Sequence, residues 1–172
     1  SVPPAQFADG YKYDVNSRAK DSAANEEMAY STRTFIVDQT SAASKVSFPA
    51  HLGYLGSATQ ILGTATDQVE EVQKAPLIPG GFCDPACPAG RTFESGLDPS
   101  SVTVALFRWS DAKYWDGAAF TQSAPVWSTA TFVGDSSGTW TYALAPGALV
   151  DSSSYSVSAR VNRDRAGNIQ TV

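Results

Sequence analysis

Two segments of this chain carry the same ordered pattern of residues, and they lie 142 positions apart. One begins at Tyr13 and the other at Tyr155, and Tyr, Val, Arg, Asp, Ala and Asn recur in that order in both. The second segment has one extra residue between its Arg and its Asp. This spacing is the size of one generous β-sandwich domain, and a repeated unit must bury its apolar face against its own strands. The chain is therefore expected to hold one whole unit and the end of another.

The hydrophobic periodicity of the chain is two, which is the period of β-strands. Ser101–Trp109 is apolar on both faces and predicts a central strand, whereas Ser154–Val161 alternates apolar residues with serine and predicts a strand with one wet face. Asp116-Gly117 is a hairpin signal. Further strands are predicted at Thr32–Asp38, Lys45–Phe48, Ala58–Asp67, Pro125–Phe132 and Thr139–Leu144. The sequence therefore predicts an all-β fold.

Composition excludes several classes of function. The net charge is −5 and only 17% of the 172 residues are charged, so no basic face for nucleic acid or anionic lipid is expected. No apolar run approaches the ~18 residues of a membrane span. One histidine and two cysteines are too few for clustered His/Cys metal sites. The abundance of Ser, Thr, Ala, Val and Gly is typical of an extracellular all-β protein.

The repeat and the turn signals predict the domain organisation. Residues 1–30 are interpreted as the closing strand pair of a preceding repeat, or as a donor or linker strand, and residues 31–172 as one complete β-sandwich. A long loop rich in Pro, Gly and Cys is expected at about 74–99. A loop of that length inside a compact domain is usually functional or held by a crosslink.

Several short motifs occur in a characteristic order along the chain. They are TFxVD at Thr34–Asp38, VxFPA at Val46–Ala50, GTATD at Gly63–Asp67, a strand and hairpin at Val104–Phe120, Trp127, and DxAGN at Asp164–Asn168. This set resembles the bacterial immunoglobulin-like repeats of large cell-surface and adhesin proteins, over residues 31–172 and again over 11–27. The resemblance implies an immunoglobulin-like Greek-key β-sandwich that acts in tandem as a stalk, fibre or surface layer. Asp21–Asn25 lacks the glycine of the motif, so its turn is expected to differ.

The expected function is that of a structural repeat module on the outside of a cell, assembling head-to-tail with neighbouring repeats or with copies of the same protein. Tyr11, Tyr13 and Val15 form an apolar pattern without a complete sheet of their own, and an unpaired strand seeks a sheet edge. That strand either extends this chain's own sheet or completes a sandwich in another chain by strand addition. The competing hypothesis is an adhesin or carbohydrate-binding module that recognises surface glycans through exposed aromatics or the Cys loop.

The oxygen ligands of two turns suit calcium. The candidate ligands follow the two repeated strands, and they are Asp21, Asn25, Asp164 and Asn168, to which Asp38, Asp67, Glu70 and Glu71 could contribute. The alternative is that these Asp and Asn side chains cap turns by bonding to backbone groups. Nothing in the chain resembles an EF-hand loop, and no other cofactor is expected.

The two cysteines, Cys83 and Cys87, sit in the Pro/Gly-rich loop. In an extracellular protein this pair predicts a local disulfide that rigidifies a short turn, and two free thiols are the alternative. Their spacing is three residues rather than the two of a redox motif, so a redox role is not expected.

Two further residue types bear on function. Among the aromatics, Trp115 in the predicted hairpin is the best candidate for exposure and hence for facing a ligand; the others are expected to be core residues. His51 is the only histidine and the chain has no G-x-S-x-G elbow, so no catalytic triad is predicted. The chain is therefore not expected to be an enzyme.

Overall fold

The computed structural model describes residues 7–29, 31–67 and 95–170. Within these ranges all regular secondary structure is β-strand. The all-β class predicted from the period-two alternation is confirmed for this part of the chain. The described residues form two units. The first unit runs to Gln39, and the second comprises the residues from Thr40 to Asp67 and from Ser95 onward.

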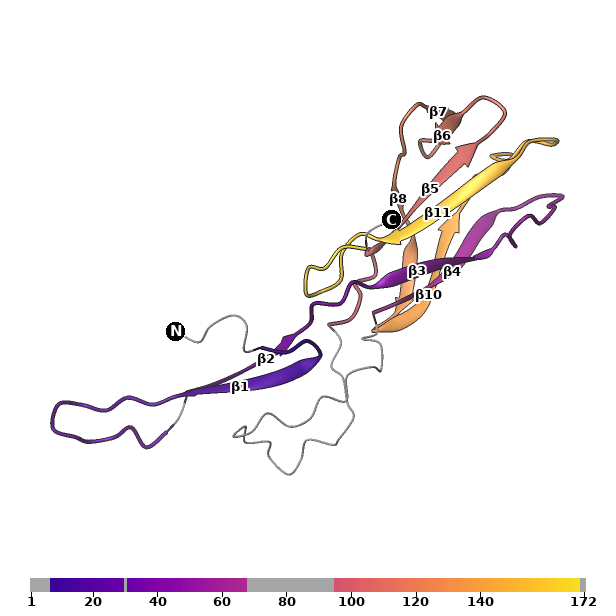
Figure 1. The fold of residues 1–172 in the computed structure, drawn as a ribbon. Coiled ribbons are helices and arrows are strands. Elements are labelled where there is room, and N and C mark those ends of the chain that lie inside the picture. Colours follow the sequence, from indigo (N-terminus) through magenta and orange to yellow (C-terminus); the bar gives the residue numbers. More distant parts are fainter. Residues whose placement is uncertain (1–6, 30, 68–94, 171–172) are drawn as a thin grey trace. The chain divides into compact units, whose positions relative to one another are not determined.

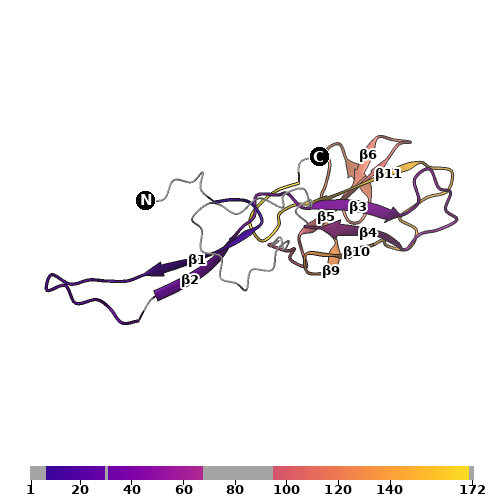
Figure 2. The same ribbon diagram turned by 60° about the horizontal axis from the view of Figure 1, so that its bottom comes forward.

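The first unit contains one antiparallel hairpin, built from β1 (Tyr11–Ser17) and β2 (Ser31–Val37). The two strands pair along their full length, side by side in both views of the ribbon (Figure 1, Figure 2). The first unit therefore ends after Gln39, not at residue 30 as the sequence pattern predicts. The pattern marks β2 correctly as a strand, but alternation alone carries no information on which neighbour a strand joins.

Aromatic side chains gather on one face of this hairpin. Tyr13 lies opposite Phe35 with the rings stacked at a centroid distance of 5.5 Å, and Phe7 packs edge-on against both rings. Among the described residues of the first unit no second sheet covers either face of the hairpin, and Phe35 on one face is 37% exposed and Ile36 on the other 42% exposed. An isolated two-stranded hairpin is only marginally stable in water.

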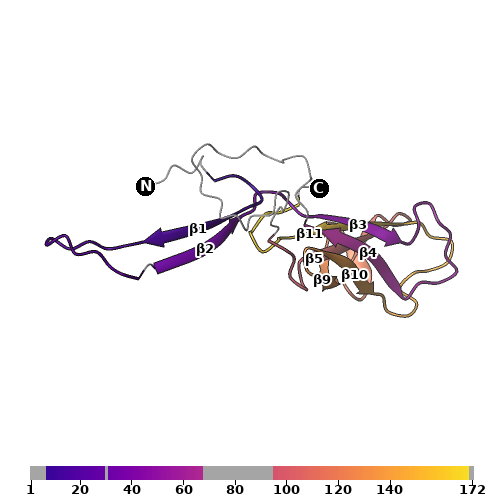
Figure 3. The ribbon, with the colours of Figure 1, turned by 90° about the horizontal axis from the view of Figure 1, so that it is seen from below.

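The second unit consists of two antiparallel sheets that face each other in a sandwich-like arrangement (Figure 1, Figure 3). The first sheet has the order β3–β4–β10–β9, from β3 (Ala43–Phe48), β4 (Gln60–Thr66), β10 (Ser137–Ala143) and β9 (Thr131–Gly134). The second has the order β11–β5–β6–β7, with β8 also on β5, from β11 (Tyr155–Val161), β5 (Val102–Arg108), β6 (Lys113–Trp115), β7 (Phe120–Gln122) and β8 (Ser128–Thr129).

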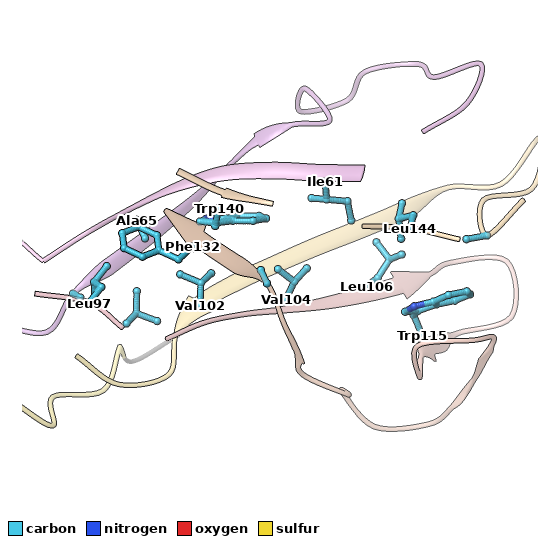
Figure 4. Packing of buried hydrophobic residues seen from close by; sticks show 14 of the residues in the cluster. Ile61, Ala65, Leu97, Val102, Val104, Leu106, Trp115, Phe132, Trp140 and Leu144 are labelled. Atoms are coloured by element: carbon cyan, nitrogen blue, oxygen red, sulfur yellow. The ribbon is translucent and has the colours of Figure 1, made fainter. Parts of the chain in front are cut away.

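The hydrophobic core fills the space between these two sheets (Figure 4). Trp140 of β10 is fully buried, and its indole N–H donates to the backbone carbonyl of Thr64 at 3.1 Å. Gly63 lies opposite Trp140, and a Cβ at this position would meet the indole ring at 2.1 Å, so the ring requires a glycine there. Val104 and Leu106 of β5 close the core from the other sheet.

The segment Pro125–Phe132, predicted as one strand, is divided between the two sheets. β8 pairs with β5 and β9 pairs with β10, so the chain changes sheets at Ala130. Ala130 is buried and its amide donates to the carbonyl of Val102 at 2.9 Å. The alternation places Phe132 correctly in the core, because a change of sheet preserves which side chains point inward.

Candidate functional site

The first copy of the repeated turn is closed by the side chains of Asp21 and Asn25. The Asp21 amide donates to the Asn25 carbonyl at 3.0 Å, and one Asp21 carboxylate oxygen accepts from the amides of Ala23 and Asn25. The other oxygen accepts from the Asn25 side-chain amide at 2.9 Å. That side-chain hydrogen bond is the main cause of a lowered pKa at Asp21.

The second copy repeats this arrangement at Asp164 and Asn168. The Asp164 amide donates to the Asn168 carbonyl at 3.1 Å, and Asp164 Oδ1 accepts from the amides of Gly167 and Asn168. Asp164 Oδ2 accepts from the Asn168 side-chain amide at 2.9 Å, the same distance as in the first copy. The turn-capping interpretation of the four residues is therefore confirmed.

The correspondence continues beyond the turn on both sides. The Glu27 amide donates to the Ala19 carbonyl at 2.9 Å, and the Gln170 amide donates to the Val161 carbonyl at 3.2 Å. The Glu27 side chain also accepts from the Ala19 amide at 3.1 Å, and the Gln170 side chain accepts from the Val161 amide at 2.8 Å. The two turns thus share the hydrogen bonds between aspartate and asparagine and the hydrogen bonds that flank the turn.

The expectation that the first turn differs is confirmed in one hydrogen bond. Asp21 Oδ1 accepts from the Ala23 amide, two residues on, whereas Asp164 Oδ1 accepts from the Gly167 amide, three residues on. The backbone is otherwise alike in the two turns. Ala24 adopts a φ of +71° where Gly167 adopts +99°, and each donates its amide to the carbonyl of the preceding aspartate. Left-handed backbone is unfavourable for alanine. The hydrogen bonds to Asp21 impose this conformation on Ala24 in spite of that cost.

A second buried carboxylate lies beside the second turn. Asp67 and Asp164 are 2% and 3% exposed, and each has a carboxylate oxygen within 4.8 Å of the other. Asp67 Oδ2 accepts from the Gly96 amide at 2.6 Å and from the Ser95 hydroxyl at 3.0 Å. Like charges at this separation repel, and burial strengthens the repulsion because water screens it less.

The second turn is also joined to the start of its own unit. The Asn168 side-chain amide donates to the Thr40 carbonyl at 3.2 Å. Asp38, another candidate ligand, belongs to the first unit and is itself 8% exposed. Glu70 and Glu71 lie outside the described residues.

These groups have the chemistry of a calcium site. Calcium takes carboxylate and carbonyl oxygens, which Asp67, Asp164 and the Thr40 carbonyl offer together. A divalent cation would also remove the repulsion between the two buried carboxylates. Asp21 has the same turn but is exposed, so of the two predicted sites the one at Asp164 and Asn168 fits a cation better. Calcium binding itself stays a prediction.

The aromatic predicted to be exposed is in fact buried. Trp115 is 4% exposed, because the β6–β7 hairpin folds back onto the core and the Trp115 indole N–H donates to the Tyr142 hydroxyl at 3.2 Å. Trp109 is the exposed tryptophan, at 63%. Its ring meets Phe107 edge-on at 5.1 Å, and its indole N–H donates to Ser156 at 2.8 Å.

The sequence interpretation missed Arg165, which lies inside the repeated motif. Its guanidinium pairs with Asp135 at 2.6 Å and Asp98 at 3.2 Å, and it donates to the Leu97 carbonyl at 3.0 Å. These hydrogen bonds hold the loop segment of residues 95–98, which supplies the Gly96 amide to Asp67. No local pattern could have revealed this role, because the partners lie 30 to 68 residues away.

Two remaining predicted features have different outcomes. Cys83 and Cys87 lie outside the described residues, so the disulfide stays a prediction. His51 is exposed in the loop between β3 and β4, as expected for a surface histidine. Among the described residues no helix has the length and apolar character needed to cross a membrane.

Comparisons with family models, with curated protein sequences and with solved structures found no significant match to this chain.

Proposed function

We propose that this chain is a structural repeat module of an extracellular stalk, fibre or filament, built from bacterial immunoglobulin-like units that assemble head-to-tail. The observation that carries the proposal is the repeated turn. The same hydrogen bonds between aspartate and asparagine close the turn at Asp21–Asn25 and the turn at Asp164–Asn168. Reuse of one turn with its flanking strand is what a tandem array of similar units produces.

The order of strands in the second unit supports the immunoglobulin-like part of the proposal. An immunoglobulin domain has one sheet of order A-B-E-D and a second sheet containing C, F and G. The order β3–β4–β10–β9 corresponds to the first sheet, and the neighbours β5 and β11 correspond to C and F. Under this assignment β1, as the copy of β11, is an F strand of another unit.

The two units differ in a way that suits assembly. The second unit buries its apolar side chains in its own core, whereas the hairpin of the first unit leaves Val15, Phe35 and Ile36 exposed. Exposed apolar strands in a two-stranded sheet are a surface for further strands. If the uncovered hairpin of one copy contacts the sandwich-like unit of the next, the two surfaces in contact are different. Such head-to-tail contacts do not close on themselves and generate filaments.

Light scattering of the purified full chain over a series of concentrations tests the proposal. We expect the mean molar mass to rise continuously with concentration, since head-to-tail contacts are open-ended. Parallel measurements with and without a disulfide reductant control for crosslinking through Cys83 and Cys87. A constant monomer mass at every concentration would overturn the proposal.

Calcium binding near Asp67 and Asp164 fits this function, because a cation held by both carboxylates would crosslink two segments of the second unit. The Thr40 carbonyl is already bound to the turn through Asn168. A cation bridging this turn and Asp67 would link β4 to the residues that follow β11, two parts of the unit far apart in the sequence.

A second candidate function is glycan binding, and the exposure of Trp109 is the observation that favours it. Sugars stack on exposed aromatic faces, and Phe107 holds the Trp109 ring edge-on. We expect a glycan-binding chain to lose affinity when Trp109→Ala is introduced. Val133→Ala, at a side chain 70% exposed on the other sheet, is the matched control. Equal binding by both variants would contradict this candidate.

A further inference from the structure

The second sheet of the second unit carries aromatic side chains on the side that faces away from the core. β5 directs Val104 and Leu106 into the core (Figure 4), so the side chains that alternate with them lie on the opposite side. We call this opposite side of the sheet the outer face. Phe107 lies on it and meets Trp109 at a ring-centroid distance of 5.1 Å and Tyr114, its partner on β6, at 4.8 Å. Three adjoining rings thus lie outside the core.

A fourth aromatic ring on the outer face holds the side chain of Arg160. Thr103 of β5 pairs with Thr129 of β8 on one side and with Arg160 of β11 on the other. Trp127 precedes Thr129 by two residues, and the guanidinium of Arg160 stacks on its ring, with Cζ 4.1 Å from the ring centroid. This cation–π contact fixes the guanidinium on the outer face.

Arg160 is a cation without an anionic partner in the part of the chain that the structure describes. It forms no hydrogen bond or ion pair there, and its Nε is buried. The hydroxyl of Thr103, directly across the ladder, is also buried and unpartnered, and Thr103 is 8% exposed. By contrast, Arg108 and Arg165 are both paired with aspartates. The two Nη atoms of Arg160 reach solvent, because only its Nε is both buried and unpartnered.

Small side chains lie between the stacked guanidinium and the exposed tryptophan. The Trp109 indole N–H donates to the Ser156 hydroxyl at 2.8 Å. Ser158, the next residue of β11 on the outer face, is exposed and lies opposite Ala105. Four residues separate Ser156 from Arg160, which is about 13 Å along a strand. The outer face therefore presents an aromatic ring at one end, a guanidinium at the other, and hydroxyls between them.

These groups match the chemistry of an acidic oligosaccharide. Sugar rings stack their C–H faces on aromatic rings, and sugar hydroxyls exchange hydrogen bonds with serine hydroxyls. A sugar carboxylate pairs with a guanidinium through charge-assisted hydrogen bonds. The length of the outer face between Trp109 and Arg160 suits several linked sugars rather than one. An acidic peptide supplies the carboxylate but not the flat ring for Trp109, so the outer face favours the saccharide.

We propose that the outer face binds an oligosaccharide that carries carboxylates, with one sugar stacked on Trp109 and a carboxylate bound by the Nη atoms of Arg160. The inference rests on the second candidate function, glycan binding, and names acidic sugars as its ligand class. It does not depend on head-to-tail assembly, because all the residues that form the site belong to the second unit.

Calorimetric titration of the full chain with two matched probes tests the ligand class. The probes are short oligomers of galacturonic acid and the methyl esters of the same oligomers, which keep the sugar rings and remove the charge. EDTA in the buffer prevents calcium from bridging carboxylates. We expect the acid form to bind at least about tenfold more tightly than the ester, since a charge-assisted hydrogen bond is lost with the ester. The preference should shrink as salt is added, because ions screen the pair.

Arg160→Gln tests the assigned cation, and Arg163→Gln is the matched control. Arg163 is exposed just beyond the end of β11, so its substitution makes the same change in net charge. We expect Arg160→Gln to weaken binding of the acid form about tenfold and to leave the ester unaffected, whereas Arg163→Gln stays within about twofold of the unmodified chain. Melting curves check folding, and Trp109→Ala, at an exposed ring, provides a second variant that should weaken both probes about fivefold.

The possible outcomes separate the inference from the function on which it rests. Equal affinity for the acid and the ester, reduced in Trp109→Ala, would overturn the acidic ligand class and leave glycan binding standing. Binding of neither probe would remove both. Binding of a polyglutamate peptide in place of the sugars would overturn the inference in favour of a peptide ligand. Equal loss in Arg160→Gln and Arg163→Gln would contradict the role of Arg160.

Discussion

The hairpin of the first unit and β11 of the second contain the same local design in two surroundings. The hydrogen bonds between the aspartate and the asparagine are the same in the two turns, yet Asp21 is exposed and Asp164 is 3% exposed. Local sequence thus determines the hydrogen bonds of the turn, and the strands packed around it determine how much those bonds contribute to stability. The following substitutions test that separation.

The largest effect is expected from Trp140→Ala in the core of the second unit. Removing a fully buried tryptophan leaves a cavity and lowers the free energy of unfolding by about 3–5 kcal/mol. Chemical denaturation followed by Tyr and Trp fluorescence measures this loss. Amide exchange in β1 and β2 should not change, and faster exchange there would show that the two regions do not differ as described.

Calcium should stabilise the second region alone. At a calcium concentration about 100 times the dissociation constant, binding raises the free energy of unfolding by about 2.7 kcal/mol. Melting temperatures in calcium and in EDTA measure the effect. Asp67→Asn should abolish it, and Asp21→Asn, in the exposed copy, serves as the matched control. Identical melting curves in calcium and EDTA would remove the calcium hypothesis.

Truncating the two turn aspartates compares the copies directly. Asp164→Ala, in EDTA, removes a buried carboxylate that accepts from part-buried amides and should cost about 2 kcal/mol, because water replaces those bonds only in part. Asp21→Ala removes the acceptor of the Ala23 and Asn25 amides. Because these amides are exposed and water replaces the acceptor, the loss should be under about 0.5 kcal/mol. Denaturant midpoints of the two variants give the difference, and equal losses would refute the role assigned to burial.

The smallest effect concerns the residue with positive φ in each turn. Gly167→Ala should destabilise its turn by about 1–2 kcal/mol, the cost of left-handed backbone for alanine. Ala24→Gly should tighten the first turn by less than about 1 kcal/mol, since glycine also loses more entropy on folding. Exchange rates of the Asn25 and Asn168 amides report each change. An unchanged rate for Asn168 would indicate that the two turns do not share one conformation.

Much of the fold could be predicted from alternation, and the exceptions have physical reasons. Ser101–Trp109 was predictable as a central strand because both of its faces are apolar. Pro125–Phe132 was not predictable as two strands, since a change of sheet at Ala130 leaves the inward pattern intact. The exposure of Trp115 was predicted wrongly, because the hydrogen bond to Tyr142 joins segments 27 residues apart.

The site was predictable in its chemistry but not in its geometry. Asp164 and Asn168 follow a strand in a turn motif, and that pattern alone indicated capping or calcium. The proximity of Asp67 to Asp164 depends on two sheets meeting at one end, which no local pattern encodes. Ala24 shows the converse case, in which side-chain hydrogen bonds overcome the backbone preference of a residue.

Electron microscopy of the purified full-length chain tests the central claim most directly. The account predicts filaments with one repeat of constant length along the axis. Isolated particles of uniform size at every concentration would contradict it.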